Sequence, residues 1–107
     1  MAKFITLGVY TAKGLGGFVN NPETDRKAAT TALAAAAGGK LTRYAGLRGK
    51  YDFMAEIEGT FEQAAAAAMV AVSSGAVSDF TILEDVNLNE IAKTANTMVS
   101  GYKEPGK

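Results

Sequence analysis

The chain has 107 residues, a length that fits one domain and leaves no room for two. Its 11 lysines and arginines balance its 11 aspartates and glutamates, which excludes a strongly basic nucleic-acid-binding protein. The sequence contains no Cys, His or Trp, so thiol nucleophiles, disulfides, imidazole bases and zinc fingers are excluded as well.

The N-terminal part of the sequence predicts a β-strand followed by a loop. Residues 4–10 alternate between two sides, and we expect the side with Ile5, Leu7 and Val9 to face the helices. Residues 11–20 contain three glycines and predict a loop with a loose helical turn.

The first helix has the best-marked ends in the sequence. Asn21 is a suitable N-cap, Pro22 fits the first helical position, and the acidic residues that follow suit the positive end of the helix dipole. The helix is expected to continue to residue 36 and to end at the pair Gly38 and Gly39.

The middle of the chain predicts two strands and a second helix. The strands cover residues 40–47 and 51–58, and a short link over 48–50 joins them. Thr60 and Gln63 have the spacing of a capping box and begin a helix that reaches about residue 74. Its expected core stripe is Phe61, Ala65, Ala68, Met69 and Val72.

The last part of the chain predicts a fourth strand, a third helix and a disordered tail. The strand covers residues 77–83, and Asn87 with Glu90 marks the start of the helix. Residues 103–107 are polar and are expected to fray. The apolar stripe of the helix is Leu88, Ile91, Ala92, Ala95, Met98 and Val99.

The order β-α-β-β-α-β plus a C-terminal helix predicts a ferredoxin-like domain of the α+β class over residues 1–102. In this fold a four-stranded antiparallel sheet carries both helices on one face. The opposite face is expected to hold Phe4, Thr6, Tyr10, Tyr44 and Met54. Such a face needs a cover, which the C-terminal helix, a second subunit or a ligand can supply.

Alanine surrounds the first two predicted helices, in the runs 34–37 and 64–68. A helix exposed to water usually shows Glu and Lys on its outer face. We expect that neighbouring subunits partly bury these helices, although alanine is also the best helix former and is tolerated on an exposed face.

Three short motifs follow one another in a recognisable order. They are Tyr10-Thr11 with Gly14, then Gly38-Gly39-Lys40-Leu41, and finally Gly49-Lys50-Tyr51-Asp52. With Arg26 and the turn 74–77, this order resembles the GYD domain family of small bacterial and archaeal proteins, over about residues 3–92. The resemblance implies a dimeric α+β barrel, in which two ferredoxin-like sheets pack open face to open face. It implies no established activity.

Asp52 is the candidate catalytic residue of the sequence. One interpretation places its carboxyl at the mouth of the covered open face, where it could act as a general base. The other is structural, with the carboxylate bonded to a backbone amide at the turn. Tyr10 and Tyr44 are expected to reach the same face, where they either orient a small aromatic or oxygenated molecule or pack at an interface.

Met54 and Glu56 follow Asp52 on one side of the same strand. Asp52 and Glu56 are then ~13 Å apart, too far to work as a carboxylate pair. Arg43 and Arg48 are candidate partners for these acids, either in a cross-strand ion pair or together with a ligand.

The sequence predicts no cofactor and no metal site. Without His or Cys only carboxylate sites for hard cations remain, and no Asp/Glu cluster has the required spacing. The glycines over 14–17 lack the third glycine of a dinucleotide fingerprint, because Val19 stands there.

No stretch approaches the ~18–20 apolar residues of a membrane span, and residues 1–10 lack the continuous apolar run of a secretory signal. We therefore expect a cytoplasmic homo-oligomer without nucleic-acid or membrane partners, whose role is binding or assembly, with a small-molecule site at the open face. The alternative, which the barrel resemblance implies, is an enzyme that cyclises, isomerises or oxygenates a small, often aromatic, substrate. Relatives of that kind often use a His base, so Asp52 with Tyr10 or Tyr44 would have to replace it. A third hypothesis is a ring held together by the alanine-faced helices.

Overall fold

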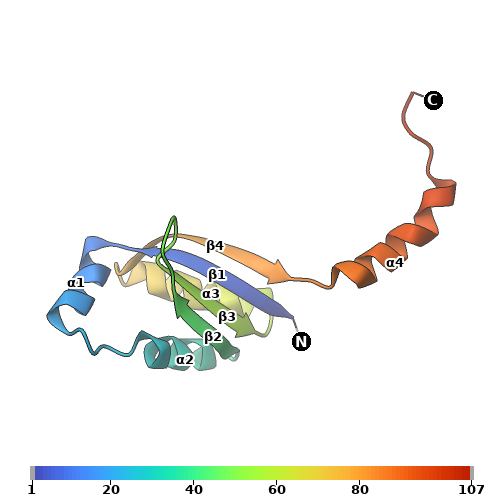
Figure 1. The fold of residues 1–107 in the computed structure, drawn as a ribbon. Coiled ribbons are helices and arrows are strands. Elements are labelled where there is room, and N and C mark those ends of the chain that lie inside the picture. The colour runs from blue at the N-terminus through green and yellow to red at the C-terminus, as the bar shows by residue number, and fades with distance from the viewer. Residues whose placement is uncertain (1, 107) are drawn as a thin grey trace.

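A computed structural model describes residues 2–106 and contains a four-stranded antiparallel sheet in the order β2-β3-β1-β4 (Figure 1). The strands are β1 (Lys3–Tyr10), β2 (Lys40–Gly46), β3 (Phe53–Glu58) and β4 (Val77–Asp85). The helices are α1 (Ala12–Asn20), α2 (Arg26–Ala36), α3 (Phe61–Ser73) and α4 (Leu88–Met98), and a 3-10 turn, η1, follows at Val99–Gly101. The predicted α+β class and the roughly ferredoxin-like order of elements are confirmed.

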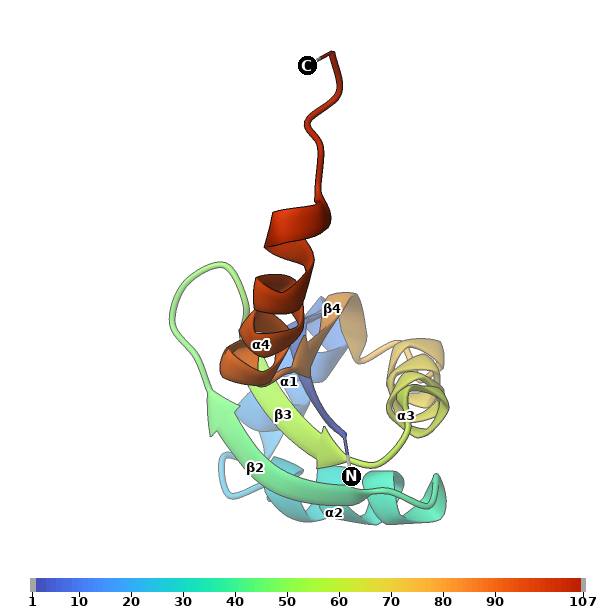
Figure 2. The ribbon, with the colours of Figure 1, turned by 90° about the vertical axis from the view of Figure 1, so that its right-hand side faces the viewer.

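Helices α2 and α3 lie on the same side of the sheet, whereas the opposite side is bare (Figure 2). The core between them is built from small residues, with Ala34, Ile57 and Ala67 buried at its centre. No large side chain in the described part of the chain is fully buried. The molecule therefore has a thin core on one side of the sheet and an uncovered surface on the other.

The two sides of β1 lie the opposite way round from the prediction. Phe4 is 7% exposed and its ring packs against the ring of Phe61 in α3, with the centroids 6.0 Å apart. Thr6 is buried on the same side. Because β1 is apolar on both sides, alternation alone cannot tell which side faces the helices. The alanine-rich helices leave room for the longer aromatic side chains, and the aliphatic side chains are left on the bare face.

The bare surface, called the open face below, is therefore more apolar than expected. Directly opposed residues of neighbouring strands lie on the same face, and the register pairs Ile5 with Leu83 and Leu7 with Met54. The apolar side chains of the open face are Ile5, Leu7, Val9, Met54 and Leu83.

A bulge in β2 corrects a second expectation. The pairing with β3 shifts between Leu41 and Arg43, so that Thr42 is an extra residue in the strand. After the bulge each side chain lies on the side opposite to that predicted by simple alternation. Tyr44, expected on the open face, therefore lies on the helix side, and Arg43 lies on the open face opposite Glu56.

The segment predicted as a loop over residues 11–20 is the helix α1. Thr11 is its N-cap and accepts a hydrogen bond from the Gly14 amide at 3.2 Å. The Thr11 amide donates to the Ala76 carbonyl at 3.0 Å, and the Lys13 ammonium donates to the Ser74 carbonyl at 2.9 Å. These tertiary contacts hold a helix that its glycines alone disfavour.

Helix α2 begins later than predicted. Asn21 is the C-cap of α1, since its amide donates to the Gly17 carbonyl at 3.1 Å, and it is not the N-cap of the next helix. Asp25 takes that role and accepts a hydrogen bond from the Ala28 amide at 2.9 Å. The expected start at Asn21 and Pro22 is therefore wrong by about one turn.

The capping box of α3 is confirmed, but its expected core stripe is only partly correct. Thr60 and Gln63 exchange hydrogen bonds between side chain and backbone as predicted. The buried residues are Ala64, Ala67 and Ala68, whereas Met69 is 69% exposed. In a helix made mostly of alanine, the larger apolar residues do not mark the buried side.

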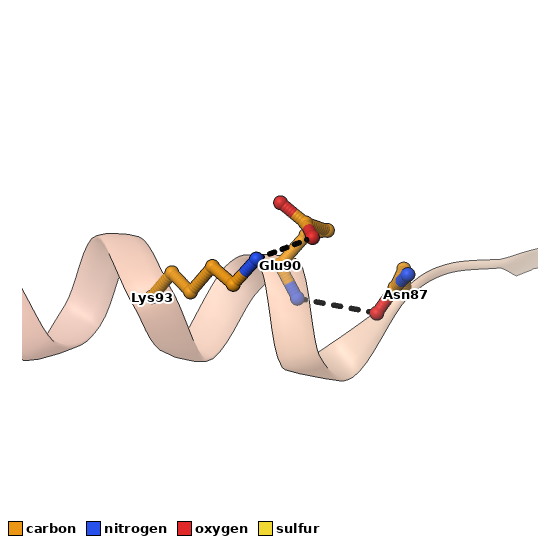
Figure 3. A network of polar contacts seen from close by, with 3 residues as sticks. All are labelled: Asn87, Glu90 and Lys93. Atoms are coloured by element: carbon orange, nitrogen blue, oxygen red, sulfur yellow. Dashed lines mark hydrogen bonds and ion pairs between the residues drawn. The ribbon is translucent and has the colours of Figure 1, made fainter.

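Helix α4 projects away from the sheet (Figure 1). The Asn87 side chain caps it by accepting from the Glu90 amide at 3.1 Å, and Lys93 forms an ion pair with Glu90 at 3.0 Å (Figure 3). Residues 103–106 form no helix or strand, their predicted disorder stays a prediction, and Lys107 lies outside the described residues.

Candidate functional site

An aromatic cluster lies on the helix side of the sheet, where β1 ends and α1 begins. The ring of Tyr10 stacks on Phe53 with centroids 4.9 Å apart and meets Phe18 of α1 edge-on at 5.3 Å. Tyr44 also stacks on Phe53, with centroids 6.0 Å apart, and the two tyrosine hydroxyls form a short hydrogen bond. Side chains from three strands and one helix thus form a single unit.

Arg26, the first residue of α2, covers this cluster. Its guanidinium lies 4.4 Å from the centre of the Phe18 ring and 5.2 Å from that of Tyr10, which is cation–π geometry. It also donates a hydrogen bond to the Gly14 carbonyl at 2.9 Å, which ties α2 to α1. Within residues 2–106 no carboxylate forms an ion pair with this guanidinium.

Asp52 directly precedes β3 and lies beside the aromatic cluster. Its carboxylate accepts a hydrogen bond from the Tyr10 amide at 2.9 Å, and its own amide donates to the Gly8 carbonyl at 2.8 Å. Its carbonyl accepts from the Leu47 amide at 2.9 Å. Asp52 therefore ties the loop between β2 and β3 to β1. The structural interpretation is right that the carboxylate bonds a backbone amide, but this amide belongs to β1 and not to the turn.

The Tyr10 hydroxyl is partly buried and hydrogen-bonded in this site. Burial raises the pKa of its hydroxyl well above the ordinary value, and the hydrogen bond with Tyr44 adds to the rise, while the nearby Arg26 opposes it. The phenol therefore stays protonated at neutral pH. With Tyr44, Asp52 and Arg26 it lines an open hollow that holds hydrogen-bond donors, an acceptor and a cation.

A family model described as GYD domain matches residues 4–95, which is most of the chain. The chain belongs to the GYD domain family. The resemblance predicted from its motifs is thereby confirmed. No match to a curated protein was found.

The signature segment of this GYD domain, residues 49–52, is hydrogen-bonded to the neighbouring strands. Gly49 has φ +132°, a backbone conformation that favours glycine. The Tyr51 hydroxyl is hydrogen-bonded to the Thr81 hydroxyl of β4 at 3.0 Å, and Asp52 holds the Tyr10 amide. The signature thus ties the β2–β3 loop to β1 and β4.

The structure divides the predicted site residues of the GYD domain into two groups. Tyr10, Tyr44 and Asp52 come together, but on the helix side and not on the expected open face. Met54, Glu56 and Arg43 lie on the open face, away from that cluster.

The expected pairing of Arg43 with Glu56 is absent from the described residues. The two are opposed in the register, but the Glu56 carboxylate accepts a hydrogen bond from the Thr42 hydroxyl at 2.6 Å. The bulge at Thr42 brings this hydroxyl to the carboxylate.

Two residues of the cluster were missed as site residues by sequence reasoning. Phe18 lay in a segment predicted as a loop, so the sequence did not indicate which side of a helix it occupies. Arg26 matched the family pattern, but no spacing in the sequence linked it to Tyr10.

The open face and α4 form a second candidate surface. The apolar stripe predicted for α4 is largely exposed: Leu88 and Val99 are each 72% exposed. Leu83 on the open face is 47% exposed.

The described residues contain neither a membrane-spanning helix nor a metal-binding group of side chains. Among residues 2–106, no helix has both the length and the apolar character for crossing a membrane. The same residues hold no group of three or more acidic side chains placed to bind a metal ion.

Proposed function

We propose that this GYD domain works as a self-assembling protein, at least a homodimer, in which a second copy covers the open face and α4. The observation that carries the proposal is the unpartnered stripe of α4. Ile91 is 53% exposed and Met98 is 64% exposed, although both belong to the apolar side of an amphipathic helix.

Helix stability supports a partner for α4. The helix has 11 residues, and isolated helices shorter than ~12–15 residues are marginal in water. Complete burial of a Leu, Ile or Met side chain contributes about 1.5–3 kcal/mol. A surface that covers the stripe therefore supplies the stabilisation that α4 lacks in a single chain.

A second copy of the chain supplies such a surface. The open face is apolar through Ile5, Leu7 and Leu83, of which Ile5 and Leu7 are half-buried and Leu83 is 47% exposed. In a twofold dimer each copy presents the same surfaces to the other, so both exposed regions of both copies become covered at once. In this arrangement Met54, Glu56 and Arg43 are interface residues.

Catalysis is the second candidate function, and the gathering of Tyr10, Tyr44 and Asp52 in one hollow favours it. It has weaker support, because the Asp52 carboxylate is bonded to a backbone amide and the Tyr10 phenol stays protonated. A cytoplasmic location stays a prediction from the sequence.

The assembly proposal is tested by sedimentation velocity on two matched variants. Leu83→Glu places a charge on the open face, and Met69→Glu places the same charge on the outer side of α3, where the residue is 69% exposed. We expect Leu83→Glu to sediment as a monomer and Met69→Glu to keep the oligomeric state of the wild type. Unchanged association in Leu83→Glu would contradict the proposal.

A further inference from the structure

A cavity of about 220 Å³ lies between the sheet and the two helices α2 and α3, on the side opposite the open face. The sheet contributes Thr6 and Phe53 to its wall, and the helices contribute mainly alanines, such as Ala29 and Ala68. Larger aliphatic side chains at these helix positions would fill the space. Ala67 and Ala68, from the run 64–68 that was expected at a subunit contact, thus leave room inside the domain.

The Thr6 hydroxyl is an unpaired polar group at this cavity. Thr6 is 5% exposed, and its Oγ1 is the one buried side-chain polar atom of the described residues that has no hydrogen-bond partner. Burying a hydroxyl without a partner is unfavourable, and native proteins rarely leave one unpaired. A polar atom of a ligand in the cavity would satisfy it.

Arg26 supplies a positive charge at the edge of the same cavity. A guanidinium has five N–H donors, and the structure gives Arg26 one hydrogen bond, to the Gly14 carbonyl. The residue is only partly exposed and has no ion-pair partner within residues 2–106. Charge and free donors together favour a carboxylate, which binds guanidinium groups strongly.

The size and walls of the cavity indicate the rest of the ligand. An apolar cavity of ~150 Å³ binds benzene, so a cavity of about 220 Å³ suits about nine non-hydrogen atoms by proportion. The rings of Tyr10, Phe53 and Phe80 line it, and aromatic rings favour stacked or edge-on contact with another ring.

We propose that the cavity binds a small aromatic carboxylate, with the ring against the alanines of α2 and α3 and the carboxylate at Arg26. A hydroxyl group on the ring hydrogen-bonds to Thr6. This site is independent of the proposed assembly, since it lies on the other side of the sheet.

Binding of the ligand inside the cavity is tested by NMR chemical-shift titration with benzoate at neutral pH. The protein is first shown by native mass spectrometry to carry no adduct. Ala68→Leu narrows the cavity, and Ala66→Leu makes the same change at an exposed position of the same helix. We expect Ala68→Leu to weaken benzoate binding at least tenfold and Ala66→Leu to leave it unchanged. Equal affinity in the two variants, or no binding to the wild type at millimolar benzoate, would overturn the proposal.

The two polar contacts are tested with paired ligands. Wild type should bind 4-hydroxybenzoate about three- to tenfold more tightly than benzoate, as one hydrogen bond allows, and Thr6→Val should abolish that difference. Arg26→Gln should weaken benzoate binding but retain binding of uncharged toluene, which also shows that the cavity is intact. A preference for 4-hydroxybenzoate that survives Thr6→Val, or equal loss of benzoate and toluene in a folded Arg26→Gln, would contradict the assignment. Leu83→Glu should bind benzoate like the wild type, which separates this site from the assembly.

Discussion

Tyr10 connects more parts of the domain than any other residue of the aromatic cluster. Its amide donates to Asp52, its hydroxyl is hydrogen-bonded to Tyr44, and its ring packs on Phe18 and Phe53. Ionisation of its hydroxyl would place a negative charge in this partly buried position. The pH dependence of stability therefore reports on the cluster.

The raised pKa of the Tyr10 hydroxyl predicts a loss of stability at high pH. In the unfolded chain a tyrosine ionises near pH ~10, whereas the folded domain holds this proton to higher pH. The contribution of the Tyr10 hydroxyl to the free energy of unfolding is constant below pH ~10. Above that pH, the free energy of unfolding falls by at most about 1.4 kcal/mol per pH unit. Urea denaturation at pH 9 and pH 11 measures this. We expect wild type to lose more stability than Tyr10→Phe over that interval, and equal losses would contradict the assignment.

Helix α1 is the clearest case of an element that the sequence did not predict. Its three glycines indicate a loop, and the contacts that stabilise the helix come from the α3–β4 turn and from Arg26, distant in the sequence. Cap residues within a few positions of one another, such as Thr60 with Gln63, were predicted correctly because the interaction is local. The order of the other helices and strands was predictable because local sequence patterns mark these elements.

Two glycines of α1 give opposite predictions for the same substitution. A Cβ at Gly14 would overlap the Ala76 carbonyl oxygen, whereas a Cβ at Gly16 meets nothing within 4 Å. We expect Gly14→Ala to destabilise the domain by roughly 1–3 kcal/mol through overpacking. Gly16→Ala should stabilise it by about 0.5–1 kcal/mol through helix propensity. Thermal and urea denaturation of both variants check this; stabilisation by Gly14→Ala would show that α1 does not pack against this turn.

The sides of the strands were harder to predict than the strands themselves. Alternation identified β1, but its two sides are both apolar, and the choice between them depended on helices made of alanine. In β2 the extra residue Thr42 reversed the sides of Arg43 and Tyr44, and no local signal marks that bulge. Tyr10, Tyr44 and Asp52 were therefore predicted on the wrong side of the sheet, although the structure does bring them together.

The whole molecule is more extended than a compact domain of its length. Its radius of gyration is 18.2 Å, with extents of 63 × 29 × 21 Å, whereas a compact domain of this length has a radius of about 13 Å. Helix α4 extends the molecule, because it projects away from the end of β4 (Figure 1).

Substitutions in the projecting helix α4 test whether its apolar stripe lies in the subunit interface. Ile91→Glu places a charge in the apolar stripe of α4, and Asn89→Glu places the same charge on its polar side, near the helix N-terminus, where it is tolerated. We expect Ile91→Glu to weaken association at least tenfold in sedimentation equilibrium, and Asn89→Glu to leave it unchanged. Equal association of both variants would show that the stripe is not in the interface.

Native mass spectrometry of the wild-type protein tests the proposed assembly most directly. The account predicts a species of two or more chains at micromolar concentration, because the open face and the stripe of α4 both lack partners in one copy. A monomer at that concentration, with α4 still helical by circular dichroism, would contradict self-assembly and show that the helix needs no second copy.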